Sequence, residues 1–201
     1  MDCNLERYGN AMNNFTIEHT YIKDLIIIKP KVFGDHRGFF MEFYNKESFA
    51  ELGLNMEFVQ DNHSKSKKGV LRGIHFQTEY PQGKLVRVIK GRVYDVAVDL
   101  RKESSTFGKW FGIELSEENK LMLYIPEGFG HAFLTLEDDT EFMYKTTNVY
   151  HPEYDAGIIY NDEDIGIEWP DIGSDFILSE KDKKLPRLKD AVLFKSLRSE
   201  P

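Results

Sequence analysis

Short runs of β-branched, aliphatic and aromatic residues recur along the chain, and Gly, Pro, Asn and Asp residues separate them. Apolar runs bounded by turn-forming residues are typical of β-strands. In residues 93–99 polar and apolar positions nearly alternate, as a strand with one buried face requires. Asp95 and Asp99 share a face with Ala97 there, so we expect that face to line a polar cavity. Strands are predicted at residues 25–28, 39–44, 69–76, 85–89, 93–100, 110–115, 121–125, 131–136, 141–147 and 158–160.

The helical signal is confined to two short stretches. Residues 46–52 are predicted as a short helix, because Asn45 can cap its start and Gly53 can end it. Ser179, which acidic residues follow, is typical of a second helix start. Many short strands with little helix predict an all-β fold, an antiparallel sandwich or barrel rather than a βαβ fold.

The length and composition fit a single globular domain. The chain has 201 residues, of which 41% are hydrophobic and 30% charged. At this size one core can form without disulfides or metals to support it. No repeat, low-complexity tract or linker interrupts the sequence. We expect a flexible N-terminal extension at residues 1–14, one domain at residues 15–190 and a C-terminal tail at residues 191–201.

Several features fit a protein of the cytoplasm. The single cysteine, Cys3, excludes an intrachain disulfide, which fits a reducing compartment. No apolar run is long enough to span a bilayer, and the N-terminus lacks the apolar segment of a signal peptide. The net charge of −8 argues against nucleic acid as a partner. It does not argue against an anionic small molecule, because basic side chains can converge locally.

Two stretches contain candidate residues of a functional site, residues 69–91 and residues 126–133. They resemble the two signature segments of the cupin superfamily, in which histidines and a glutamate of a β-barrel bind a metal. His75 and His131 occupy two of the histidine positions, whereas Gln77 and Lys84 replace the other two ligands. An ammonium group has no lone pair and repels a cation, and two histidines alone make a poor metal site. We therefore expect a cupin pocket that binds no metal and needs no cofactor.

The residues that replace the metal site suggest proton transfer beside a ketone. The imidazole of His75 can remove a moderately acidic proton near neutral pH. The ammonium group of Lys84 can stabilise the oxyanion that then develops on a neighbouring carbonyl. Taken singly, each residue has a simpler explanation, since most histidines are structural and most lysines lie on the surface. Their combination in one pair of motifs favours the catalytic interpretation.

The resemblance extends far beyond the cupin segments. The chain resembles the dTDP-4-dehydrorhamnose 3,5-epimerase family from about residue 15 to about residue 190, in order and at the family's spacing. The matching segments are residues 30–42, 58–66, 70–77, 82–87, 95–101, 104–108, 126–133, 141–148, 161–163, 167–170 and 178–182. This resemblance implies a jelly-roll cupin fold of antiparallel strands with a few short helices. It also implies a dTDP-sugar substrate and a metal-independent isomerase of dTDP-rhamnose and polysaccharide biosynthesis.

The resemblance also implies a role for each catalytic residue. His75 would be the general base, and Asp182 its carboxylate partner. Lys84 would stabilise the enolate oxygen at C4. Tyr144 would reprotonate the opposite face as a neutral phenol whose pKa a nearby cation lowers. The alignment of Asp182 is the least secure of these, because residues 171–177 before it are variable in character.

Substrate binding is implied in the same way. Arg37 and Arg72 would bind the diphosphate, since a guanidinium fork matches phosphate oxygens. His131 would lie in the sugar pocket beside the base. The thymidine and sugar pockets would be lined by Phe33, Glu42, Gln60, Asn62 and Tyr150. The family forms homodimers that exchange N-terminal strands, so Phe33, Arg37 and Glu42 would serve the neighbouring active site.

Three alternatives remain open. A related enzyme would invert only C3 or only C5, using the same base and tyrosine. A metal-dependent cupin enzyme is a second class, and Gln77 and Lys84 speak against it. A non-catalytic nucleotide-sugar-binding cupin is a third, since fold alone does not fix function. The unbroken match favours inversion at both carbons of dTDP-4-dehydro-6-deoxy-D-glucose, giving dTDP-4-dehydro-L-rhamnose.

Overall fold

The computed structural model describes residues 13–194, and almost all of their regular structure is β-strand. One group of strands comprises β1 (Phe15–His19), β2 (Ile26–Pro30), β5 (Gln60–Ser66), β7 (Lys84–Lys90), β10 (Met122–Ile125) and β12 (Thr140–Thr146). A second comprises β6 (Leu71–Gln77), β8 (Arg92–Asp99), β9 (Trp110–Ser116), β11 (Phe129–Thr135) and β13 (Asp155–Gly157). The remaining elements are β3 (Phe33–Asp35), β4 (Gly38–Phe40), α1 (Lys46–Glu51), and the 3-10 turns η1 (Pro152–Tyr154), η2 (Asp182–Lys184) and η3 (Leu188–Asp190).

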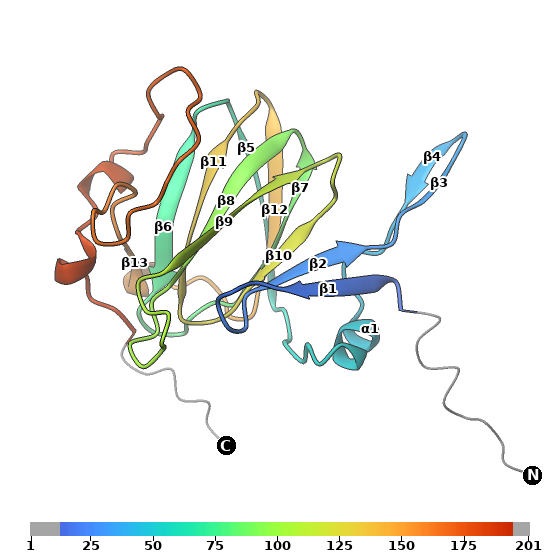
Figure 1. The fold of residues 1–201 in the computed structure, drawn as a ribbon, viewed down its shortest axis with the longest axis horizontal. Helices are drawn as coiled ribbons and strands as arrows, with labels where there is room; N and C mark the ends of the chain where they lie inside the picture. The colour runs from blue at the N-terminus through green and yellow to red at the C-terminus, as the bar shows by residue number, and fades with distance from the viewer. Residues whose placement is uncertain (1–12, 195–201) are drawn as a thin grey trace, which may run out of the picture.

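The two groups form two antiparallel sheets that pack face to face as a sandwich (Figure 1). The strand order is β1-β2-β10-β7-β12-β5 in one sheet and β13-β6-β11-β8-β9 in the other. The hairpin β3–β4 projects from the sandwich on its own (Figure 1). The all-β prediction of antiparallel strands in a cupin-type fold is thus confirmed.

The main core lies between the sheets. Val86, Leu123 and Phe142 of the six-stranded sheet meet Val93 and Phe133 of the five-stranded sheet, and all five are buried. Burying side chains of this size contributes roughly 1.5–3 kcal/mol each. The apolar end of the sandwich is filled in this way, so the polar positions of the same strands gather at the other end.

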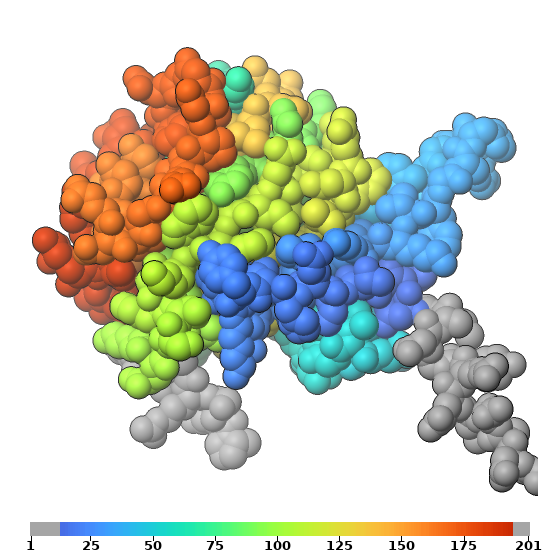
Figure 2. Space-filling model, in the orientation of Figure 1, coloured from blue at the N-terminus to red at the C-terminus, as the bar shows by residue number. Residues whose placement is uncertain are grey.

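The outer face of the five-stranded sheet is covered by the chain that follows β13. Ile158, Ile165 and Leu193 from that segment are buried against Ile74 and Val96. In Figure 2 the orange and red segment forms one flank of the molecule. Packing therefore continues to the last described residues, where the ring of Phe194 contacts the ring of Phe76.

The short helix forms where the sequence predicts it. The side chain of Asn45 accepts hydrogen bonds from the backbone N–H groups of Glu47 and Ser48, both at 3.1 Å. Phe49 on its inner face is fully buried against β1. Among residues 13–194 no helix is long and apolar enough to cross a membrane.

Several strand predictions differ from the structure, and β1 and β3 were not predicted. Residues 39–44 were expected to form one strand, but pairing ends at Phe40, because β4 belongs to the isolated hairpin. Residues 158–160 were also expected as a strand, and the pairing instead involves Asp155–Gly157 just before them. Strand β5 was missed entirely. Its inner residues face a polar pocket and its outer residues face solvent, so it carries no apolar pattern.

Gly73 allows the two histidine-bearing strands to approach closely. Its φ of +121° lies in the region that favours glycine, and a Cβ atom there would lie 2.4 Å from the Cβ of Ala132. His75 on β6 is the direct cross-strand partner of His131 on β11. The close contact of these strands thus sets the two imidazole-bearing positions side by side.

Candidate active site

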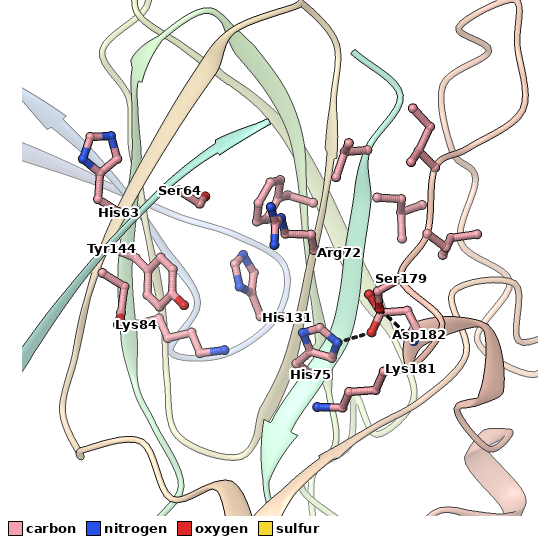
Figure 3. Close-up of a pocket in the computed structure, with 16 residues that line it drawn as sticks. His63, Ser64, Arg72, His75, Lys84, His131, Tyr144, Ser179, Lys181 and Asp182 are labelled. Carbon is pink, nitrogen blue, oxygen red and sulfur yellow. Dashed lines mark hydrogen bonds and ion pairs between the residues drawn. The ribbon is translucent and has the colours of Figure 1, made fainter. Parts of the chain in front are cut away.

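A cavity of about 550 Å³ opens between the sheets at the polar end of the sandwich. Strands β5, β6, β7, β11 and β12 supply its walls, and the segment before η2 closes one side (Figure 3). It is lined by Asn62, His63, Ser64, Val70, Leu71, Arg72, His75, Lys84, His131, Phe133, Tyr144, Ile177, Leu178, Ser179, Lys181 and Asp182. Seven site residues predicted from the sequence therefore line this cavity: His75, Asp182, Lys84, Tyr144, Arg72, His131 and Asn62.

His75 and Asp182 form a hydrogen-bonded pair, although 107 residues separate them. His75 Nε2 lies 2.6 Å from Asp182 Oδ1. The Asp182 side chain is buried and that of His75 is about one-third exposed to the cavity. Burial raises the pKa of Asp182, but hydrogen bonds from His75 and Ser179 outweigh it and hold the pKa below its usual value. The carboxylate is therefore ionised and can orient the imidazole, which directs its other nitrogen into the cavity (Figure 3).

Lys84 is a buried cation without a partner. Its side chain extends from β7 into the cavity, with 9% of the residue exposed. Within residues 13–194 it makes no ion pair or hydrogen bond. Desolvation lowers the pKa of Lys84 to about 8, although the charges of Asp95 and Asp155 act in the opposite direction. An unpaired ammonium group in a cavity is available to stabilise a negative charge that develops on a ligand.

Tyr144 lies across the cavity from His75, with Lys84 and His131 between them (Figure 3). The Lys84 ammonium nitrogen is 6.0 Å from the centre of the Tyr144 ring. A nearby cation was expected to lower the pKa of this phenol. Instead, burial dominates and raises the pKa of Tyr144, and the charge of Arg72 offsets this only in part. The phenol is consequently neutral near pH 7 and able to donate its proton.

A second histidine–carboxylate pair lies beneath the cavity. His131 Nε2 lies 2.9 Å from Asp95 Oδ2, and both side chains are buried. Desolvation lowers the pKa of His131 despite the charge of Asp95, and the positive charges of Lys84 and His75 act in the same direction. His131 is thus held as a neutral imidazole in the cavity wall. The expected polar face is present only in part: Asp95 contacts the cavity through His131, whereas Asp99 binds Arg101, Ser104 and Thr106 and does not line the cavity.

The predicted nucleoside-binding residues form a hydrogen-bonded rim beside the cavity. Gln60 donates from Nε2 to Asn62 Oδ1 at 2.9 Å and accepts the backbone N–H of Tyr150 at 2.9 Å. The Tyr150 hydroxyl donates to Asp155 at 2.8 Å, and this bond is the main cause that raises the pKa of Tyr150 to about 12. Half of Tyr150 is exposed, so its ring is open to a planar ligand.

Arg72 points into the cavity without a carboxylate partner. Its guanidinium donates to Ser66 Oγ at 3.2 Å, and no Asp or Glu of the described part of the chain pairs with it. An exposed guanidinium in a cavity is suited to a phosphate ligand.

Three predicted binding residues lie away from the cavity of their own chain. Phe33 and Arg37 belong to the projecting hairpin, where Arg37 pairs with Asp35 at 2.6 Å. Glu42 follows the hairpin and accepts a hydrogen bond from Asn14 at 2.8 Å. The fold of a single chain does not bring these residues to His75.

The structure adds residues that sequence reasoning left out of the site. Ser179 and Lys181 line the cavity beside Asp182, and the unpartnered hydroxyl of Ser64 is buried in its wall. The sequence signals for Ser179 were its likeness to a helix start and its place in the matching segment 178–182, and neither gave it a role in the site. Within residues 13–194 no group of three or more His, Cys, Asp and Glu side chains is arranged to hold a metal ion.

Comparisons with known proteins agree with this geometry. The sequence model of the family described as dTDP-4-dehydrorhamnose 3,5-epimerase matches residues 19–190. Proteins of that name from Salmonella typhimurium and Methanothermobacter thermautotrophicus are 58% and 54% identical to the chain. These alignments cover 87% and 89% of the chain and 96% and 97% of the relatives.

Solved structures show the same likeness. A dTDP-6-deoxy-D-glucose-3,5-epimerase of Legionella pneumophila, in complex with dTDP-4-keto-L-rhamnose, has a TM-score of 0.85 at 48% identity. That alignment covers 88% of this chain and 94% of the other. A 3'-monoepimerase of Streptomyces bikiniensis in complex with dTDP-quinovose has a TM-score of 0.79 at 34% identity, covering 85% and 86%.

Proposed function

The chain belongs to the dTDP-4-dehydrorhamnose 3,5-epimerase family, and we propose that it inverts C3 and C5 of dTDP-4-dehydro-6-deoxy-D-glucose. The product is dTDP-4-dehydro-L-rhamnose. One observation supports the chemistry above all others. A His75–Asp182 pair and the Tyr144 hydroxyl lie on opposite sides of one cavity, with the unpaired Lys84 ammonium group between them.

His75 is the base in this proposal. Its Nε2–H donates to Asp182, which leaves the lone pair of Nδ1 free toward the cavity. A hydrogen on a carbon next to the C4 ketone is acidic enough for an imidazole to remove. The electron pair of the C–H bond then moves onto the C4 oxygen, and Lys84 stabilises the resulting enolate.

Tyr144 returns a proton to the opposite face of the same carbon. Its raised pKa keeps the phenol protonated at neutral pH. The enolate collapses to the ketone as the carbon takes the phenolic proton, so the configuration at that carbon is inverted. Repetition at the second carbon requires the ring to turn within the cavity, and proton exchange between the residues and water resets the site.

Arg72 binds the diphosphate in this arrangement, and His131 lines the sugar pocket. Tyr150 stacks on the thymine, with Gln60 and Asn62 beside it. The dTDP-keto sugar in the Legionella complex supports a substrate of this chemical class.

We also propose a homodimer in which the β3–β4 hairpin of one chain completes the cavity of the other. Phe33, Phe39 and Phe40 of this hairpin are 44%, 59% and 66% exposed, and the hairpin projects away from the body (Figure 1). Exposed aromatic residues on a projecting element mark an interaction surface. Pairing of this kind would carry Phe33 and Arg37 of the hairpin, and Glu42 just after it, toward the partner's cavity.

The cytoplasm is the proposed location, since its nucleotide-sugar pools supply such a substrate. We retain residues 15–190 as the proposed catalytic domain. Of the proposed extension at residues 1–14, residues 1–12 lie outside the described structure. In the proposed tail at residues 191–201, residues 195–201 likewise lie outside the described structure.

The decisive experiment is solvent isotope incorporation. The purified, chelator-treated protein is incubated with dTDP-4-dehydro-6-deoxy-D-glucose in D2O, and the product is examined by mass spectrometry and NMR. Deuterium at both C3 and C5 of an L-configured product is the expected result. Deuterium at one carbon would identify a single-site epimerase, as the likeness to a 3'-monoepimerase allows. No incorporation above the uncatalysed control would overturn the catalytic assignment.

A further inference from the structure

Asp182 differs from the other catalytic residues in how the fold holds it. His75, Lys84 and Tyr144 lie within paired strands, whose ladder hydrogen bonds fix their backbones. Asp182 begins the three-residue turn η2, which follows a long irregular segment. Sheet pairing therefore does not determine where this carboxylate lies.

The backbone hydrogen bonds that join this segment to the rest of the fold lie on either side of Asp182. Ile177 is the last residue joined to β6, through hydrogen bonds with Gly69 at 2.8 Å and Leu71 at 3.0 Å. Beyond it, the bonds of Lys183 to Ser179 and of Lys184 to Lys181 are internal to the turn. After the turn, the carbonyl of Pro186 accepts the backbone N–H of Ile159 at 2.9 Å. Between Ile177 and Pro186, side-chain contacts must therefore set where the Asp182 carboxylate lies.

Ser179 makes the contact that fixes Asp182 from within the turn. Its Oγ accepts the backbone N–H of Asp182 at 3.0 Å, while its carbonyl accepts the N–H of Lys183 at 3.1 Å. A hydroxyl three residues before an N–H satisfies that donor as a cap does at the start of a helix. The same side chain also favours the ionised carboxylate of Asp182 and lines the cavity.

Lys181 holds the turn from outside. Its ammonium group pairs with Asp155 on β13, and β13 pairs with β6 at His75 itself. Lys181 thus attaches the turn to β13, and Ser179 attaches Asp182 to the turn. We propose that Ser179 is a positioning residue that holds Asp182 in hydrogen-bonding reach of His75; this inference rests on the catalytic role proposed for that pair.

A displacement of Asp182 should be measurable as a loss of rate, because its hydrogen bond to His75 is short and directional. A misplacement of a catalytic group by about 1 Å can lower a rate about 100-fold. Loss of the Ser179 hydrogen bond alone, with the Lys181–Asp155 ion pair intact, should displace Asp182 by less than about 1 Å. Ser179→Ala should therefore lower kcat about ten-fold and leave the affinity for dTDP unchanged, since Ser179 acts on the base and not on the nucleotide.

The test compares Ser179→Ala with four further variants of the full-length enzyme: Ser179→Thr, Glu180→Ala, Asp182→Asn and the double variant Asp182→Asn/Ser179→Ala. Ser179→Thr keeps the hydroxyl and should restore most of the rate. Glu180→Ala changes a neighbouring residue of the same turn that is exposed, pairs only with Lys183 and does not contact Asp182, and should be neutral. In an Asp182→Asn background, Ser179→Ala should lower kcat no further, because the residue acts through Asp182.

Three results would overturn the proposal. They are an unchanged kcat for Ser179→Ala, an equal loss in the Asp182→Asn background, or a dTDP affinity that falls in parallel with kcat. A spectroscopic measurement separates this inference from the proposed function. The low-field NMR signal of the His75 ring N–H bonded to Asp182 needs no substrate. It should persist in Glu180→Ala and broaden or vanish in Ser179→Ala, even if the wild-type protein fails to exchange deuterium.

Discussion

At the scale of single residues, the site separates groups by their charge and burial. Lys84 is buried and unpaired, Asp182 is buried and ionised, and Tyr144 is buried and neutral. Burial disfavours the charged form of all three, and it therefore keeps Tyr144 neutral. Hydrogen bonds keep Asp182 ionised, and the charges of Asp95 and Asp155 limit the fall in the pKa of Lys84. These protonation states fit the roles proposed for Asp182 as base partner, Lys84 as oxyanion donor and Tyr144 as acid.

Replacement of the proposed base should abolish most turnover. His75→Asn is expected to lower kcat by about 10³-fold, because general base catalysis typically contributes 10²–10⁴. The affinity for dTDP should stay near the wild-type value, since Arg72 and the rim residues remain. Stopped assays of product formation and calorimetric titration with dTDP measure the two quantities. A variant with most of its activity would remove His75 from the base role.

Lys84 should give the enzyme a basic limb in its pH–rate profile. Its ammonium group is charged below its pKa of about 8, so enolate stabilisation is present there and is lost as the pH rises through 8. Lys84→Arg should retain some activity and shift this limb upward, because a guanidinium stays charged to pH 12 or above. A profile of kcat/KM between pH 6 and 10 is the measurement. If the wild type and Lys84→Arg lose activity over the same pH range, the basic limb belongs to another group.

The buried ammonium group should also cost stability. The lowered pKa means that folding disfavours the charged form, by about 3 kcal/mol at roughly 1.4 kcal/mol per pH unit. The free energy of unfolding should therefore rise between pH 8 and about pH 10.4, the usual lysine pKa. Lys84→Met is expected to raise the melting temperature at pH 7 while lowering kcat. A lower melting temperature for Lys84→Met would contradict this account of the buried charge.

At the scale of elements, the close contact of β6 and β11 bears on stability, whereas the projecting β3–β4 hairpin bears on the proposed dimer. The approach of β6 and β11 at Gly73 leaves no room for a side chain. Gly73→Ala should therefore destabilise the fold by about 3 kcal/mol, through overpacking and an unfavourable φ. Chemical denaturation would measure this change, with Gly53→Ala as the control, since a Cβ there meets no atom within 4 Å although its φ is also positive.

The hairpin can be tested by complementation between inactive chains. Arg37→Ala and His75→Asn should each be inactive alone. In co-expressed mixed dimers, one cavity would contain an intact His75 together with an intact Arg37 from the other chain. About a quarter of wild-type activity is then expected, because half of a random mixture is mixed dimer with one complete site. No recovery would mean that Arg37 does not serve the neighbouring cavity.

At the scale of the whole molecule, a sandwich closed at one end by apolar residues leaves a polar cavity at the other. The cupin positions that would carry metal ligands hold Gln77 and Lys84 instead. Gln77 donates to the backbone carbonyls of Tyr80 and Val149, so it supports the chain around the cavity. Exhaustive dialysis against a chelator should consequently leave kcat unchanged. Activity that is lost and then restored by a divalent metal would revive the metal-dependent class.

Sequence reasoning predicted most of the fold, and the residues that it proposed for the chemistry line one cavity. Alternation along residues 93–99 and the capping residue Asn45 act locally, so strand β8 and helix α1 could be predicted from their own residues. His75, Lys84 and Tyr144 lie within recognisable motifs. Strand β5 could not be found in this way, because its pairing with β12 and not an apolar pattern makes it a strand.

By itself the sequence determined the all-β class, the family and the residues able to exchange a proton. Only the tertiary structure decided which of those residues meet. Asp182 lies 107 positions from His75 and reaches it because Ile177 is joined to the start of β6 and Pro186 to Ile159, with Asp182 bound to the Ser179 hydroxyl between them. The raised pKa of Tyr144 and the lowered pKa of Lys84 were decided at the same level. Burial depends on every strand that surrounds a side chain, and no local pattern of residues contains it.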